Sequence, residues 1–115
     1  MKVTIYHNPK CSKSRQTLEL LYGKDIEPEI IEYLKHPPSK TRLTRILELL
    51  GMEPRDLMRK SEAVYKTARL DNPKLTRDQL IAAMVQHPVL IERPIVLANG
   101  KAAIGRPPEN VLEIL

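Results

Sequence analysis

The chain has 115 residues, a net charge of +5 and a single cysteine, and 42% of its residues are hydrophobic. This length favours one domain, and one cysteine excludes an internal disulfide bond. The 19 Lys and Arg residues are scattered and only four tyrosines offer stacking platforms, so we expect no nucleic-acid partner. No apolar run approaches the roughly 20 residues that span a bilayer. No secretory signal is visible either, so we expect a cytoplasmic protein without a membrane partner.

The first predicted strand, residues 3–6, leads into a turn that carries the only thiol, Cys11. The leucine-bearing stretch that follows predicts a helix beginning at this thiol. Free N–H groups at a helix N-terminus favour a thiolate over a thiol. Lys10, Lys13 and Arg15 add positive charge beside it. The sequence therefore predicts a nucleophile that acts on an anion.

Alternative interpretations apply to each residue of this turn. A single cysteine such as Cys11 is often a small buried hydrophobe, although its neighbours here are polar or charged. Ser14 stands where a redox Cys-x-x-Cys motif has its second cysteine, and it either caps the helix or hydrogen-bonds the Cys11 sulfur. His7 either modulates the pKa of the thiol or is a structural turn histidine.

A second extended segment, residues 29–33, completes a parallel, right-handed βαβ unit with the first strand. A helix is then predicted from an N-cap at Ser39 to Gly51, because leucine and isoleucine recur at helical spacing between them. Residues 54–60 predict a further helical turn, and residues 62–70 a weaker helix.

The last third of the chain returns to strands. Residues 76–79 have the composition of a capping box that starts another helix. Residues 95–97 and 102–104 are short apolar strands joined by an Asn-Gly pair, which is a strong hairpin signal. A terminal helix is predicted over residues 109–115.

The order of these elements predicts an α/β fold, a thioredoxin-like βαβ–(helical insertion)–ββα with a mixed sheet of about four strands. We expect a single domain over residues 1–115, with the insertion at about residues 39–87. In the thioredoxin arrangement a cis-proline before the third strand faces the reactive cysteine, and Pro94 occupies that position. No His/Cys/Asp cluster has metal-ligand spacing, so we expect no metal site and no bound cofactor.

Five segments of the chain carry recognisable motifs. They are His7-Asn-Pro-x-Cys11-Ser-x-Ser14-Arg15, Pro37-Pro38, Leu57-Met-Arg59-Lys60, His87-Pro88-x-Leu90-Ile91-x-Arg93-Pro94-Ile95-Val96 and Gly105-Arg106-Pro107. Together they resemble the glutaredoxin-linked arsenate reductase family, nearly from end to end. The resemblance implies a thioredoxin-like fold with a helical insertion between its two halves.

The resemblance also implies roles for particular residues. The catalytic cysteine falls on Cys11, and the thiolate-modulating histidine and serine fall on His7 and Ser14. The oxyanion-binding arginines fall on Arg59, Arg93 and Arg106. Arginine suits this role because its guanidinium binds tetrahedral oxyanions bidentately and stays charged at every working pH.

The family's reaction implies the partners. The cysteine attacks arsenate, glutathione attacks the resulting adduct as co-substrate, arsenite leaves, and glutaredoxin reduces the mixed disulfide that remains. The cysteine count leads to a similar expectation by itself, because a chain with one cysteine needs an external thiol to complete turnover.

Two other functions remain open. The chain is alternatively a monothiol glutathione-dependent oxidoreductase without arsenate specificity, since Ser12 and Lys13 depart from the Cys-Gly-Thr-Ser of plasmid-type reductases. The third reading is an RNA-polymerase-binding thiol-stress regulator. Such regulators generally carry a Cys-x-x-Cys switch, and Ser14 cannot form that disulfide.

Overall fold

The computed structural model describes residues 2–115. These residues form two compact units. The first combines the two ends of the chain, up to His36 and from Arg93 onward, and the second is Pro37–Glu92. None of the helices within residues 2–115 has the length and apolarity needed to cross a membrane.

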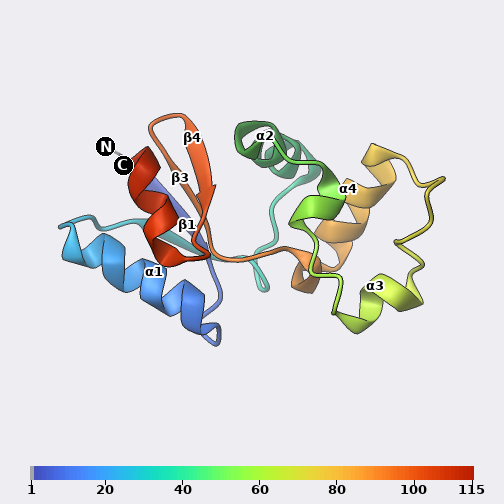
Figure 1. The fold of residues 1–115 in the computed structure, drawn as a ribbon, viewed down its shortest axis with the longest axis horizontal. Helices are drawn as coiled ribbons and strands as arrows, with labels where there is room; N and C mark the ends of the chain where they lie inside the picture. Colours follow the sequence, from blue (N-terminus) through green and yellow to red (C-terminus); the bar gives the residue numbers. More distant parts are fainter. Residues whose placement is uncertain (1) are drawn as a thin grey trace. The chain divides into compact units, whose positions relative to one another are not determined.

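A four-stranded mixed sheet in the order β2-β1-β3-β4 forms the centre of the first unit (Figure 1). The strands are β1 Val3–His7, β2 Glu29–Glu32, β3 Ile95–Ala98 and β4 Lys101–Ile104. β1 runs parallel to β2 and antiparallel to β3, and β3 is antiparallel to β4. The predicted βαβ unit, hairpin and mixed four-stranded sheet are therefore confirmed.

The connections explain these strand directions. The helix α1, Ser12–Gly23, joins β1 to β2 as the crossover that a parallel pair requires. Between β3 and β4, Asn99 and Gly100 have φ values of 54° and 71°. Positive φ at both central residues gives a two-residue turn whose twist matches that of the strands, so the Asn-Gly pair sets the register of the hairpin.

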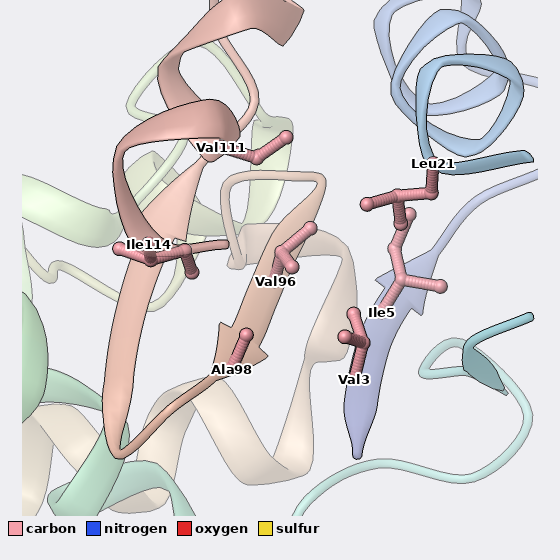
Figure 2. Close-up of a cluster of buried hydrophobic side chains, with 7 residues drawn as sticks. All are labelled: Val3, Ile5, Leu21, Val96, Ala98, Val111 and Ile114. Carbon is pink, nitrogen blue, oxygen red and sulfur yellow. The ribbon is translucent and has the colours of Figure 1, made fainter. Parts of the chain in front are cut away.

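One face of the sheet is covered by α1 and by the terminal segment η3, Pro108–Ile114. Figure 2 shows Leu21 of α1 and Val111 of η3 in the same buried cluster as Ile5 and Val96 of the sheet. The terminal helix predicted from the sequence is a 3₁₀ helix. Pro108 at its start is compatible with either helical form, because the first N–H groups of a helix have no carbonyl partner within it.

The second unit is helical, as predicted for the insertion. It contains α2 Lys40–Leu50, η1 Pro54–Leu57, α3 Ala63–Thr67, α4 Arg77–Gln86 and η2 Pro88–Leu90. The Ser39 hydroxyl caps α2 by accepting the Arg42 N–H at 3.1 Å, and Gly51 ends the helix in the left-handed region. The capping box of Thr76 and Gln79 starts α4. These predicted helix ends are confirmed.

The weak helix predicted over residues 62–70 is shorter than expected. Only Ala63–Thr67 are helical, and none of these side chains is buried. Arg69 then adopts a φ of 55°, which ends the helical conformation. Most helical stability in proteins comes from packing of an apolar face. Residues 63–67 bury no such face, so packing does not favour a longer helix here.

We expect Leu21→Ala to destabilise the protein by about 2–5 kcal/mol, because the fully buried side chain joins α1 to the sheet. The free energy of unfolding in urea measures this. Leu112→Ala, at a residue that is 40% exposed in η3, is the control and should change stability by less than about 0.5 kcal/mol. Equal losses in the two variants would contradict the assigned core.

Candidate active site

Cys11 lies in the loop after β1 and is the N-cap residue of α1. Its N–H donates to the Asn8 carbonyl at 3.0 Å, which closes the turn, and its own carbonyl accepts the Arg15 N–H at 3.0 Å. The helix therefore begins at the thiol, as the sequence predicts. The residue is buried, with only 8% of its surface exposed, so the electrostatics of its neighbours decide the charge of the sulfur.

The pKa of the Cys11 thiol is lowered even though the residue is buried. Burial alone raises the pKa, but hydrogen bonds from the Ser14 N–H, the Arg93 side chain and the Lys13 N–H outweigh it, together with the positive charge of Arg93. The amides belong to the first turn of α1, where N–H groups lack carbonyl partners. The sulfur therefore carries negative charge at a lower pH than an ordinary cysteine does.

Two arginines converge on this sulfur from the segments next to β3 and β4. Arg106 donates from Nη2 to the Cys11 Sγ at 3.6 Å and from Nε to the Arg93 carbonyl at 2.8 Å. Arg93 precedes Pro94, and the peptide bond between them is cis. The structure thus brings together three of the predicted site residues, Cys11, Arg93 and Arg106.

Gly105 sets the approach of this arginine segment to the rest of the site. Its N–H donates to the Pro94 carbonyl at 2.9 Å. A Cβ added at Gly105 would lie 2.8 Å from Cγ of Pro94 and would clash with the hydroxyl of Thr17 in α1. The sequence analysis assigned Gly105 no role of its own, although a glycine directly before Arg106, in a chain with only four glycines, was an available signal.

The Ser14 hydroxyl does not bind the sulfur. It lies 2.6 Å from Nδ1 of His7 and accepts the Asn8 N–H at 3.0 Å. The group of Ser14 that hydrogen-bonds Cys11 is its backbone N–H. The buried serine and histidine therefore connect the end of β1 to the first turn of α1 and hold the intervening loop.

The surroundings of His7 favour its uncharged form. Burial lowers its pKa, the Glu32 carboxylate raises it, and the Arg15 charge lowers it again, with a net decrease. The Ser14 hydroxyl accepts the Asn8 N–H and shares a second hydrogen bond with His7 Nδ1, in which the imidazole tautomer sets the donor. The structure thus links His7 to the thiol through Ser14.

Arg59 belongs to the second unit and is bound there by two carboxylates. Its Nη1 lies 3.1 Å from Oε1 of Glu92, and its Nε lies 3.4 Å from Oε2 of Glu62. The side chain is only 20% exposed, so these ion pairs hold it in a defined position. The sequence analysis did not anticipate either carboxylate, although Glu62 follows Arg59 at helical spacing. The predicted place of Arg59 beside the thiol stays a prediction.

The residues of the first unit define what chemistry is available. A thiolate beside two guanidinium groups can attack the central atom of a tetrahedral oxyanion while the arginines neutralise its oxygens. Among residues 2–115, no three His, Cys, Asp or Glu side chains are grouped so that they could hold a metal ion. The candidate active site therefore consists of Cys11, Arg93 and Arg106, supported by the His7–Ser14 pair.

We expect Ser14→Ala to lower stability by about 1–3 kcal/mol, because His7 Nδ1 and the Asn8 N–H lose their buried partner. The pH midpoint of Cys11 alkylation by iodoacetamide should hardly move, since the Ser14 N–H remains. Arg93→Ala is the matched comparison and should move this midpoint to higher pH. A larger upward shift in Ser14→Ala than in Arg93→Ala would contradict the assigned contacts.

Gly105→Ala should cost about 1–3 kcal/mol of stability through overpacking against Thr17 and Pro94. It should also slow Cys11 alkylation at neutral pH, because Arg106 follows directly and must shift with it. Gly23→Ala, where a Cβ meets no atom within 4 Å, is the control. Parent-like stability in Gly105→Ala would show that this close approach is not a constraint.

Comparison with known proteins identifies the relatives of this chain. The sequence profile of the ArsC family matches residues 6–114. A relative from Escherichia coli (strain K12), the uncharacterized protein YfgD, is 54% identical over 115 residues, which cover 99% of this chain and 97% of that protein. An arsenate reductase from Haemophilus influenzae is 51% identical over 116 residues and matches 100% of both chains.

A solved structure, that of an arsenate reductase from Vibrio cholerae, is 55% identical and superimposes with a TM-score of 0.97. The match covers 100% of this chain and 98% of that one. This likeness confirms the thioredoxin-like α/β fold predicted from the order of strands and helices. By profile, sequence and structure, the chain belongs to the ArsC family.

Proposed function

We propose that this protein reduces arsenate to arsenite with Cys11 as the nucleophile, and that glutathione and glutaredoxin complete the turnover. The observation that carries the proposal is the thiolate-favouring position of Cys11 between the α1 amides and the two arginines. The relatives named arsenate reductase, at about half identity over the full chain, support arsenate as the oxyanion.

In the first step the Cys11 thiolate attacks arsenic and an S–As bond forms. One arsenate oxygen takes up protons and leaves as water, so arsenic remains As(V) in the adduct. Arg93 and Arg106 neutralise the remaining oxygens, because guanidinium groups stabilise the charge that builds on them. We assign Arg59 to the same task as a third cation, which requires it to exchange Glu62 and Glu92 for the substrate.

In the second step the thiol of glutathione attacks the adduct. A mixed disulfide between glutathione and Cys11 forms, the S–As bond breaks, and its electron pair reduces As(V) to As(III), which leaves as arsenite. Glutaredoxin and a second glutathione then reduce the mixed disulfide and release glutathione disulfide. The external thiol is necessary because Cys11 is the only cysteine. These partners place the protein in a reducing compartment, the cytoplasm.

A coupled assay tests the proposal. Arsenate, glutathione and glutaredoxin are mixed with the protein, and NADPH oxidation through glutathione reductase is followed. We expect Cys11→Ser to abolish turnover and Arg93→Ala or Arg106→Ala to lower it at least about 10-fold, since each removes a charged hydrogen bond to the reacting groups.

Arg42→Ala is the matched control, because the Arg42 side chain is exposed on α2 and the bond to Ser39 comes from its backbone N–H, which alanine keeps. It should turn over at the parent rate. Arsenate turnover that survives Cys11→Ser would overturn the assigned nucleophile. If the parent is inactive on arsenate but reduces glutathione mixed disulfides, the monothiol oxidoreductase is the correct function.

A further inference from the structure

We infer that a hollow beside the Cys11 loop binds glutathione, the reducing thiol, through its carboxylates and its ammonium group; the inference rests on the proposed function. The hollow has a volume of about 340 Å³. This lies within the range of small-molecule sites, roughly 300–1,000 Å³. Its walls are His7 at the end of β1, residues 8–10 of the following loop, and Glu32, Leu34 and Lys35 at and just after the end of β2, all in the first unit.

The charges of the hollow complement those of the tripeptide. Glutathione carries two carboxylates and one ammonium group at neutral pH, and the walls present two ammonium groups, of Lys10 and Lys35, and one carboxylate, of Glu32. The Lys35 Nζ lies 3.6 Å from the Glu32 Oε1, and the Lys35 and Glu32 side chains are 73% and 41% exposed. Such an exposed ion pair is worth little, so a ligand can replace it at low cost. Leu34, which is 45% exposed, offers an apolar wall to the ligand's carbon chain.

The strand order places this hollow on the side of β1 away from the arginines. β2, whose end forms one wall, and β3, which follows Arg93, lie on opposite sides of β1. The loop between β1 and α1 contributes the other wall and leads directly to Cys11. The hollow and the two arginines therefore lie on opposite sides of β1. The hollow ends at Lys10, the residue before Cys11, so a bound thiol would reach the sulfur from the side opposite an oxyanion held by Arg93 and Arg106.

Opposite approaches suit the second chemical step. The glutathione thiolate attacks the Cys11 sulfur, an S–S bond forms, and the S–As bond on the far side breaks with its electron pair passing to arsenic. Displacement at sulfur requires the attacking and leaving atoms to be in line. The hollow would position the attacking thiol for this geometry.

Mixed-disulfide formation isolates this binding from arsenate chemistry. The Cys11 thiolate attacks glutathione disulfide, the mixed disulfide forms, and glutathione thiolate leaves. The rate is compared in the parent, Lys35→Glu and the double variant Lys10→Glu/Lys35→Glu. The same rates are measured with bis(2-hydroxyethyl) disulfide, an uncharged reagent that reports the reactivity of the thiolate alone.

We expect the double variant to lose about 3- to 10-fold more rate with glutathione disulfide than with the uncharged disulfide, whose rate corrects for any effect of Lys10 on the thiolate itself. The difference should shrink at high salt, since the cations are exposed. Lys24→Glu makes the same charge change as Lys35→Glu. Lys24 is the C-cap residue of α1, at the opposite end of that helix from Cys11, so this variant should react like the parent.

An unchanged rate with glutathione disulfide, or an equal fall with both disulfides, would overturn the proposed binding site. An equal fall in Lys24→Glu and Lys35→Glu would overturn it too, because net charge alone would then explain the effect. These outcomes are separate from the proposed function, which fails if the parent does not reduce arsenate. A protein that reduces arsenate but shows no charge effect keeps its function and loses only this site.

Discussion

The rest of the site depends on the hydrogen bonds and positive charge that stabilise a thiolate at Cys11. A buried thiol would normally stay protonated, because a charge without partners is costly away from water. Here Arg93 and the amides at the start of α1 hydrogen-bond the sulfur and reverse that preference. Arg106 lies at hydrogen-bonding distance as well. The same cations that favour the thiolate suit an incoming oxyanion, so one set of charges serves nucleophile and substrate.

The fold supplies these partners from segments that are far apart in sequence. β1 and β3 are antiparallel neighbours in the sheet. The loop that follows β1 and leads to Cys11 therefore lies at the same end of the two strands as the segment before β3 that contains Arg93. Gly105 allows the Arg106 segment to approach Pro94 closely. The pair formed by His7 and Ser14 holds the first turn of α1 against the end of β1. Each of these contacts constrains the position of the sulfur relative to the guanidinium groups.

Local patterns predicted most of the fold. The Asn-Gly hairpin, the caps at Ser39, Gly51 and Thr76, and the βαβ spacing each follow from the chemistry of a few adjacent residues, and each appears in the structure. The weak helix predicted over residues 62–70 was overestimated because composition does not reveal that its helical part, Ala63–Thr67, buries no side chain. The terminal segment was predicted as a helix, and its residue pattern did not distinguish a 3₁₀ helix from an α-helix.

The site was predictable in its residue types and less so in its contacts. Cys11 as a helix cap follows from the sequence, and its pairing with Arg93 and Arg106 follows from the family motifs. That Ser14 acts through its N–H, and that Glu62 and Glu92 bind Arg59, depends on side-chain directions that spacing does not fix. The role of Arg59 as a third substrate ligand therefore rests on the family motif and stays a prediction.

The ionisation of Cys11 is the most direct test of this account. Thiolate absorbance in the ultraviolet, followed against pH, gives the pKa of the only cysteine without any added reagent. The same titration of the protein unfolded in urea supplies the reference. We expect the folded protein to titrate at clearly lower pH than the unfolded chain. A midpoint equal to or above that of the unfolded chain would show that the sulfur is not held as a thiolate, and would contradict the proposed mechanism.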